Sequence, residues 1–180
     1  MRCSWCNLNN PIYVKYHDNE WGKLRVDDRY LFEMLLLESF QAGLSWECIL
    51  NKRENFRKAY DNFDFVKISK YDDFKIDELM HNNGIIRNRL KIKASAANAK
   101  IFVAIKKDYG SFYEYLKRFT GDKIIYEVNK ITNDLSDAIS NDLQNRGMKF
   151  VGSVIVYSYL QAIGIINSHE QRCFLYKKAD

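Results

Sequence analysis

The feature that most constrains this fold is an apolar segment that follows Asp27. Asp27 is a typical N-cap residue, and the apolar spacing after it predicts a helix over residues 28–40. Because that helix is apolar on nearly every side, we expect it to be buried at the centre of the core. One carboxylate shares its most apolar face, which carries Leu31, Met34, Leu35 and Glu38 at i, i+3, i+4 and i+7.

A buried carboxylate such as Glu38 is costly unless a cation or a hydrogen-bond donor meets it. One explanation is an ion pair with an Arg or Lys of the protein itself, which is the more common arrangement. The other is a ligand pocket, because aromatic rings that suit a planar or cationic ligand occur nearby in the sequence. These rings, which in a plainer interpretation are ordinary core residues, are Tyr13, Tyr16, Trp21 and Trp46.

The remaining apolar periodicity predicts an all-α chain with short connections. Residues 1–26 show no sustained period and are expected to form an irregular arm, while residues 120–133 fit either a short strand or a connector. With 180 residues and no internal repeat, the chain is expected to form one domain over residues 1–180. Further helices are predicted from Ser45 to about residue 56, in a short segment after Asp64, over 73–83 and 87–107, from Ser111, from Ser136 to Gly147 and over 153–163.

Composition limits the partners of this chain. No apolar run approaches the roughly 20 residues of a membrane span, so no membrane partner is expected. The start of the chain lacks a signal-peptide pattern, and four Cys suit thiols or a metal site better than disulfides, which favours a cytoplasmic protein. The net charge of +5 is compatible with a polyanion such as nucleic acid without demanding one. A monomer is expected.

The two ends of the chain carry residue types that bind zinc. A C-x-x-C motif lies near the start, and a capping-box pattern at 168–171 predicts a short terminal helix with a His and a Cys four residues apart on one face. His17 is a fifth candidate for four tetrahedral positions. The alternative is that these are unremarkable thiols and a surface His. Spacing alone favours a zinc site made of Cys3, Cys6, His169 and Cys173.

The segment between Gly147 and Gly152 predicts a tight turn between two helices. Such a turn, which ends at a helix N-terminus, can present backbone N–H groups to a phosphate, and Lys149 and Arg146 add positive charge beside it. Helix-hairpin-helix modules hold a DNA backbone in this way. An ordinary helix-helix corner has the same local pattern, so the motif alone leaves both interpretations open.

Five motifs spread over nearly the whole chain belong together. They are Tyr-x-x-Tyr-His-Asp-x-Glu-Trp-Gly at 13–22, Leu-Glu-x-x-Gln-Ala-Gly-Leu-Ser-Trp at 37–46, Lys-Arg-Glu-Asn-Phe-Arg at 52–57, Gly-Ile-Ile-Arg at 84–87 and Lys-Phe-Val-Gly at 149–152. In combination they resemble the DNA-3-methyladenine glycosylase I family. The resemblance implies a helix-hairpin-helix DNA glycosylase fold, with the N-terminal arm (1–26) and the C-terminal tail (165–180) joined by one structural zinc ion. It also implies removal of 3-methyladenine from alkylated double-stranded DNA, without lyase activity.

The resemblance also implies roles for individual residues. It makes Glu38 the acidic residue that recognises the lesion base, with Tyr16 and Trp46 as hydrogen-bond and stacking partners and Tyr13 and Trp21 as pocket walls. It replaces Cys6 by His17 among the zinc ligands, which gives the set Cys3, His17, His169 and Cys173.

The implied substrate explains why a carboxylate belongs in the pocket. Methylation at N3 makes the adenine cationic, so a buried Glu38 selects it over neutral adenine by charge. The charged base is already a good leaving group, and strong acid catalysis is unnecessary. Many relatives place an aspartate where this chain has Asn167, which cannot supply a negative charge. We therefore expect an enzyme limited to labile cationic lesions.

Opening the duplex requires an insertion into the base stack. The apolar turn after the first long helix, with Gly43 and Leu44, is the candidate wedge, and Lys149 and Gly152 are the candidate backbone contacts. Two other functions remain open at this point. One is a zinc-stapled DNA-binding module without catalysis, and the other is a small-molecule hydrolase that uses Glu38 as acid or base.

Overall fold

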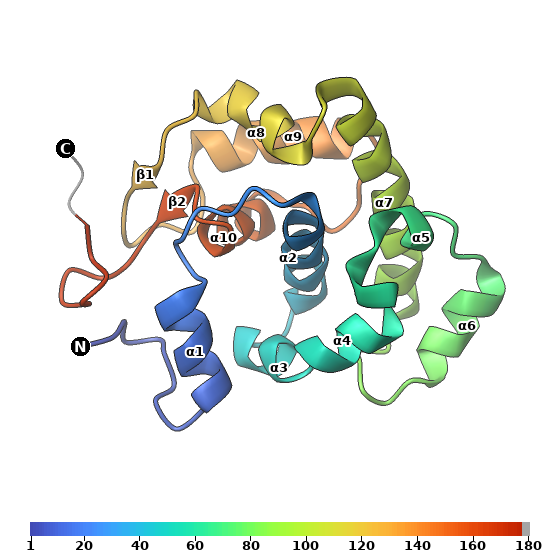
Figure 1. The fold of residues 1–180 in the computed structure, drawn as a ribbon, viewed down its shortest axis with the longest axis horizontal. Helices are drawn as coiled ribbons and strands as arrows, with labels where there is room; N and C mark the ends of the chain where they lie inside the picture. The colour runs from blue at the N-terminus through green and yellow to red at the C-terminus, as the bar shows by residue number, and fades with distance from the viewer. Residues whose placement is uncertain (178–180) are drawn as a thin grey trace.

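The computed structural model describes residues 1–177; the last three positions of the predicted tail, 178–180, lie outside the described residues. The described part is mostly helical, as the periodicity predicted (Figure 1). No helix within it is long and apolar enough to cross a membrane. The elements are α1 (Pro11–Asn19), α2 (Asp28–Gln41), α3 (Trp46–Asn51), α4 (Arg53–Ala59), the short turn η1 (Asp61–Phe63), α5 (Phe65–Ile68), α6 (Asp73–His81), α7 (Arg89–Tyr109), α8 (Phe112–Thr120), β1 (Ile125–Tyr126), α9 (Asp134–Asn145), α10 (Ser153–Ala162) and β2 (Ile166–Asn167).

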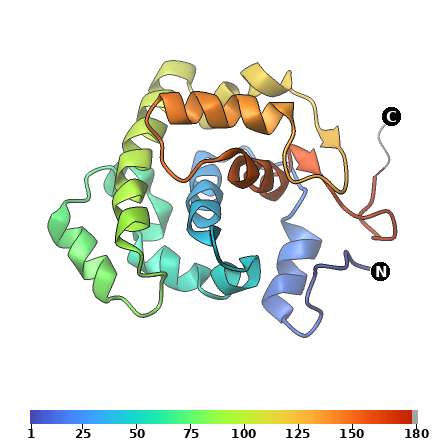
Figure 2. The same ribbon diagram turned by 180° about the vertical axis from the view of Figure 1, so that it is seen from behind.

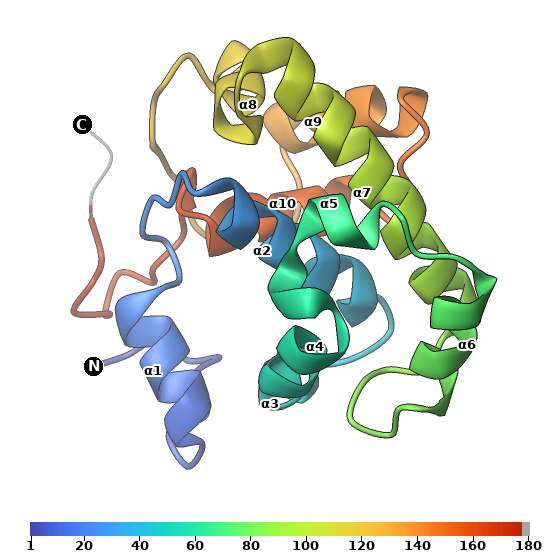
Figure 3. The same ribbon diagram turned by 45° about the vertical axis from the view of Figure 1, so that its right-hand side comes forward.

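Helix α2 lies at the centre of the fold, as predicted. The Asp27 side chain accepts a hydrogen bond from the Tyr30 N–H and so caps the helix, and every residue from Leu31 to Phe40 is buried. Helices α7, α8 and α10 pack around it (Figure 3). Because α2 is enclosed in this way, its C-terminal end is held rigidly where the chain turns toward α3.

The predicted irregular arm over 1–26 is wrong in its middle, where α1 forms. The Asn10 side chain accepts hydrogen bonds from two backbone N–H groups of the first turn, and Pro11 occupies the first helical position. This pairing is a standard helix start, since Pro lacks an N–H that would be unsatisfied there in any case. The mixed aromatic and charged composition hid that signal from periodicity.

The predicted terminal helix after Ser168 is also wrong, because residues 168–177 contain no helix and form turns only over 171–175. The His169 N–H bonds to the Asn167 side chain, and the Cys173 N–H bonds to the Glu170 carbonyl, a shorter span than a helix uses. The segment 120–133, compatible with a strand or a connector, contains β1. This strand pairs in parallel with β2 in the register Ile125 to Ile166.

One glycine fixes the path of the chain between α1 and α2. Gly164 follows α10 with φ +81°, and a Cβ there would overlap the backbone of Lys23 and Leu24. Two backbone hydrogen bonds continue this contact: Gly22 N–H donates to Gln161 O at 3.0 Å, and Arg25 N–H donates to Ile163 O at 2.9 Å. The close approach holds segment 22–25, which follows α1, against the end of α10.

Candidate functional site

Glu38 lies on α2 without an internal cation. Its side chain is 3% exposed, and Oε2 has no hydrogen-bond partner among residues 1–177. The two arginines of the 52–57 motif are engaged elsewhere, since Arg53 and Arg57 both bond to Glu33. An internal ion pair, one of the two explanations for Glu38, is therefore wrong for the described chain. Burial raises the pKa of Glu38 to about 8.

Glu38 borders a cavity of about 260 Å³. This is below the roughly 300–1,000 Å³ of pockets for drug-sized ligands, so it suits a group about the size of a single base. Elements from distant parts of the sequence surround it, including α1, the ends of α2 and α10, and the segments next to β1 and β2. All five residues predicted to form a pocket line this cavity: Tyr13, Tyr16, Trp21, Glu38 and Trp46.

The rings of the cavity pack against one another and leave polar edges unpaired. The ring centroids of Tyr16 and Trp46 are 5.4 Å apart, and the two rings are tilted by 51°. Trp46 Nε1 and Ser168 Oγ, like Glu38 Oε2, are buried without a hydrogen-bond partner in residues 1–177. Burial raises the pKa of Tyr16 well above its ordinary value, so its hydroxyl stays protonated. Buried unpaired side-chain groups are rare, and three of the six found among the described residues line this one cavity, which points to a polar, planar ligand.

Several lining residues were not predicted from the sequence. Trp5 packs edge-on against Trp21 with centroids 4.7 Å apart, and Asn129 reaches the cavity from the connector after β1. The end of α10 and the segment after β2 contribute Ser158, Gln161, Ser168 and Glu170. The aromatic composition of the arm could have suggested Trp5. The other lining residues are brought to the cavity by tertiary packing, which no local sequence pattern indicates.

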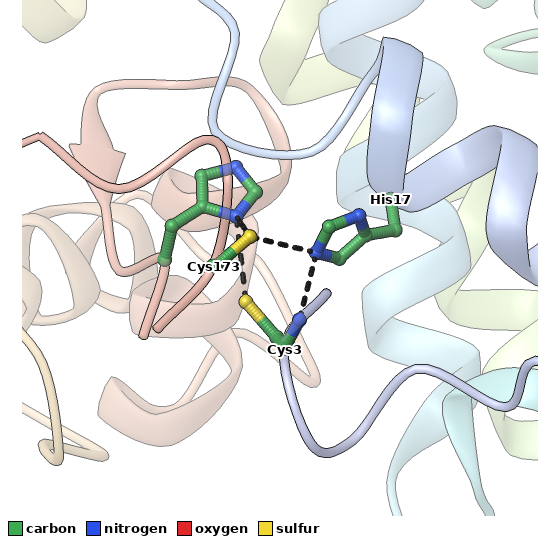
Figure 4. A group of neighbouring side chains, drawn as sticks. Cys3, His17 and Cys173 are labelled. Atoms are coloured by element: carbon green, nitrogen blue, oxygen red, sulfur yellow. Dashed lines mark hydrogen bonds between the residues drawn. The ribbon is translucent and has the colours of Figure 1, made fainter. Parts of the chain in front are cut away.

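Next to the cavity, four buried side chains form a group with the composition of a zinc site. Their ligand atoms all lie within 4.8 Å of one another, and Figure 4 shows three of them pointing to a common centre. The sulfur-to-nitrogen distances of 3.4, 3.5 and 3.6 Å match the value of about 3.5 Å expected across a tetrahedral zinc ion. The four residues are Cys3, His17, His169 and Cys173.

Neighbouring groups orient both imidazoles of this cluster. His17 Nδ1 lies 2.8 Å from the Asp18 carboxylate, and His169 Nε2 lies 3.3 Å from the Trp21 carbonyl, so each ring directs its other nitrogen to the centre. Burial lowers the pKa of His169 to about 4, which keeps that ring neutral. A neutral ring is the form that binds a metal.

Spacing alone selected the wrong fourth ligand. Cys6 is buried but does not belong to the cluster, and His17 from α1 takes its place. Cys6 N–H bonds to the Cys3 carbonyl in a turn, but the Cys6 thiol is not part of the group of mutually close ligand atoms.

The predicted wedge and hairpin residues lie on two exposed connections. Gly43 has φ +85° in the turn between α2 and α3, and the following Leu44 is 40% exposed. Helices α9 and α10 form the predicted hairpin (Figure 2), and Gly152 is the N-cap of α10. The side chain of Lys149 is exposed, but its backbone N–H is engaged by Asn98 and is not free for a phosphate.

Comparison with solved structures defines the class of this fold. The chain superposes on a crystal structure of 3-methyladenine DNA glycosylase I with a TM-score of 0.94 and 39% identity, covering 98% of this chain and 100% of that one. A variant of 3-methyladenine DNA glycosylase I crystallised in complex with 3-methyladenine gives a TM-score of 0.93 at 32% identity, with 99% of each chain covered. The fold is therefore that of a DNA glycosylase.

Sequence comparison gives the family. The family model described as methyladenine glycosylase matches residues 5–176. DNA-3-methyladenine glycosylase 1 of Escherichia coli K12 is 39% identical over 182 aligned residues, which cover 97% of this chain and 96% of that protein. The chain belongs to the methyladenine glycosylase family, whose members are hydrolases that act on N-glycosyl bonds.

Proposed function

We propose that this protein hydrolyses the N-glycosidic bond of 3-methyladenine in alkylated double-stranded DNA, releasing the free base and leaving an abasic site. The observation that carries the proposal is the unpaired, buried Glu38 in an aromatic cavity of base size. A base stacked in a duplex cannot reach such a cavity, so the nucleotide must be flipped out of the helix.

Glu38 acts by charge. The N3-methylated adenine is cationic until its bond to the sugar breaks, whereas normal adenine is neutral. The pKa of about 8 means that Glu38 releases its proton when the cationic base enters, and the ion pair then replaces the lost hydration of both charges. Neutral adenine offers no such compensation. Stacking on Trp46, worth about 1–3 kcal/mol per base, discriminates little, so the carboxylate supplies much of the selectivity.

Four aromatic residues shape the cavity around that charge. Tyr16 and Trp46 serve as the hydrogen-bonding and stacking partners of the base, and Tyr13 and Trp21 are the walls. Support comes from the position of all four side chains at the cavity. Their ring edges are the polar groups that a purine can meet.

The chemistry after binding is hydrolytic. The base leaves as a neutral molecule while the sugar becomes cation-like, so the protein mainly has to hold the flipped nucleotide and admit water. We propose a monofunctional enzyme, which forms no Schiff base with the sugar. Asn167 is also unsuited to activating water, because both ends of its amide are bonded, to Gly22 and His169.

DNA contacts are assigned to the two exposed connections. Leu44, presented by Gly43, fills the gap left by the flipped nucleotide, and the hairpin with Lys149 and Gly152 holds the backbone as in the helix-hairpin-helix superfamily. Supporting observations are the exposure of Leu44 and the absence of a side-chain cap at the N-terminus of α10, which leaves N–H groups for a phosphate.

One zinc ion is proposed as a structural cofactor that joins the chain ends. The four-ligand cluster is complete without water, which is typical of structural rather than catalytic zinc. The cluster connects the start of the chain and α1 with the segment after β2, and it lies behind Trp21, a wall of the cavity. A monomeric, cytoplasmic protein remains part of this proposal.

The two other functions are less well supported. A zinc-stapled DNA-binding module leaves the unpaired carboxylate without a role, and a small-molecule hydrolase does not account for the exposed hairpin. One assay separates the three. Incubation with methylated DNA should release 3-methyladenine if the proposal is right, whereas DNA binding without release would indicate the module, and neither would indicate a small substrate.

A further inference from the structure

Helix α7 lies between the two connections proposed to contact DNA. The first connection is the turn 42–44 after α2, and the second is the hairpin connection 146–152 between α9 and α10, which runs beside α7 in Figure 2. A buried polar side chain of α7 bonds to the backbone of each. Neither side chain lines the cavity or belongs to the metal cluster.

Lys91 holds the turn 42–44. Its side chain is buried, with 6% of the residue exposed, and its ammonium donates hydrogen bonds to Phe40 O at 2.9 Å and Ala42 O at 2.8 Å. These carbonyls lie in the last turn of α2 and at its C-cap, where no intrahelical donors are left to satisfy them. A cation at this end is also favoured by the helix dipole. The turn that carries Leu44 therefore depends on Lys91 for its anchorage.

Asn98 holds the hairpin connection. Its residue is 4% exposed, and its amide both donates to Lys149 O and accepts from Lys149 N–H, each at 2.9 Å. Phe150, the next residue, has φ +58°, a left-handed conformation that costs a non-glycine residue free energy. Ser140 Oγ bonds to Val151 O at 2.8 Å on the other side. The strained tip of the hairpin is thus held by bonds on both flanks.

The two anchors are in register on one helix. Seven residues separate Lys91 from Asn98, which is about two helical turns and about 10 Å along the axis, so both side chains leave the same face of α7. The Lys91 ammonium also lies 5.8 Å from the centroid of the Phe150 ring, within the range of a cation–π contact. The turn and the hairpin are consequently fixed relative to one another by a single rigid element.

We propose that Lys91 and Asn98 are positioning residues that set the spacing between the wedge turn and the backbone-holding hairpin. When the hairpin holds the DNA backbone, this spacing places Leu44 at the nucleotide that is flipped. The inference rests on the proposed function and adds to it the part of the protein that couples backbone contact to base flipping. Neither residue touches the base.

The test uses Lys91→Met, which keeps the side-chain length and removes the ammonium. Lys107→Met, with an exposed lysine in the last turn of the same helix, is the matched control for the lost charge. Each protein is assayed in single turnover on two freshly prepared duplexes that carry one 3-methyladenine, opposite thymine or opposite an abasic site. Binding of free 3-methyladenine reports separately on the cavity.

We expect Lys91→Met to lower the rate opposite thymine about tenfold or more, because a misplacement of about 1 Å at a reacting centre has effects of this size. Opposite the abasic site, where no base pair has to be broken, the loss should be less than about threefold. Affinity for free 3-methyladenine should be unchanged. A purely structural defect would instead lower both rates and the affinity together, and that result would overturn the inference.

Asn98→Asp tests the same claim from the hairpin. This nearly isosteric change keeps the acceptor for Lys149 N–H but replaces the donor to Lys149 O with a second acceptor, so that bond is lost. The affinity for duplex DNA should therefore fall about tenfold, while the affinity for free 3-methyladenine is retained. If the wild-type protein is active and both Lys91→Met and Asn98→Asp behave like Lys107→Met in these assays, the inference is refuted but the proposed function is not. An unmodified protein that releases no base would refute the proposed function and this inference with it.

Discussion

Glu33 and Glu38 lie five residues apart on α2 and are both buried, yet among residues 1–177 only Glu33 of the two has cationic partners, the nearer being Arg53 Nε at 2.6 Å. Arg53 also bonds to Glu20 at 2.7 Å, so its charge is fully engaged. Glu33 therefore has the structural ion pair expected of a buried carboxylate. Glu38, at the cavity, remains available for a cation that comes with the substrate.

The unpaired burial of Glu38 predicts a pH-dependent cost in stability. Its pKa is about 8 in the folded protein against an ordinary value of 4.5, so between these pH values the folded state binds more protons than the unfolded state. Stability then falls as pH rises through this window. Glu38→Gln does not titrate, and it should raise the free energy of unfolding relative to wild type by about 2–4 kcal/mol at pH 8 but hardly at pH 4.5.

Denaturant unfolding of both proteins at a series of pH values measures this difference. Glu78→Gln, an exposed glutamate of α6, provides the control and should show little pH-dependent difference from wild type. A Glu38→Gln difference that stays constant from pH 4.5 to pH 8 would show that Glu38 is ionised in the folded protein over this range, contrary to the burial argument.

The metal cluster predicts which side chains are needed to bind zinc. His17→Ala should reduce bound zinc from about one ion per chain to a small fraction, whereas Cys6→Ser should leave zinc content unchanged. Loss of the ion should lower the midpoint of thermal unfolding by at least about 5 °C, since the binding free energy of a structural metal adds to folding. Metal analysis by mass spectrometry, with calorimetry, measures both. The reverse order of the two variants would restore the C-x-x-C ligand set.

The turn after α2 predicts a defect confined to duplex DNA. Leu44→Ala should lower single-turnover excision from a duplex about tenfold, because an apolar side chain is no longer available to fill the gap in the base stack. Affinity for free 3-methyladenine should be retained, as Leu44 does not line the cavity. Val66→Ala, which truncates an exposed apolar residue of α5, is the control. Unchanged duplex excision by Leu44→Ala would assign the insertion to another segment.

The environment of Asn167 predicts a narrow substrate range. Neutral lesions need more help to leave than a cationic base does, and Asn167, whose amide is bonded to Gly22 and His169, supplies no charge here. Hypoxanthine in duplex DNA should therefore not be released above background by enzyme that excises 3-methyladenine. Chromatography of the released bases decides the point, and measurable hypoxanthine would mean that another group assists departure.

Much of this architecture is encoded locally and was accessible from the sequence. The cap at Asp27 and the apolar face after it predicted α2, and the two glycines around Lys149 predicted the hairpin. The resemblance in the 13–22 and 37–46 motifs named cavity residues that the fold then brought together. Local signals were sufficient wherever an element is defined by its own capping and periodicity.

The rest depends on contacts between distant segments. Trp5 and Asn129 reach the cavity from opposite parts of the chain, and β1 pairs with β2 in a register that no local pattern specifies. Near His169 the chain follows the geometry of the cluster and its hydrogen bonds instead of the helix suggested by the capping box. Tertiary packing overrode propensity at these positions, all of which lie at the site.

The most direct test of the central claim is single-turnover release of 3-methyladenine by wild-type protein and Glu38→Gln, with Glu78→Gln as the surface control. If Glu38 binds the cationic base, the neutral Gln variant should lose about 100-fold or more in rate while remaining folded and still binding duplex DNA. A Glu38→Gln rate within about threefold of wild type would show that the unpaired carboxylate is not what recognises the lesion.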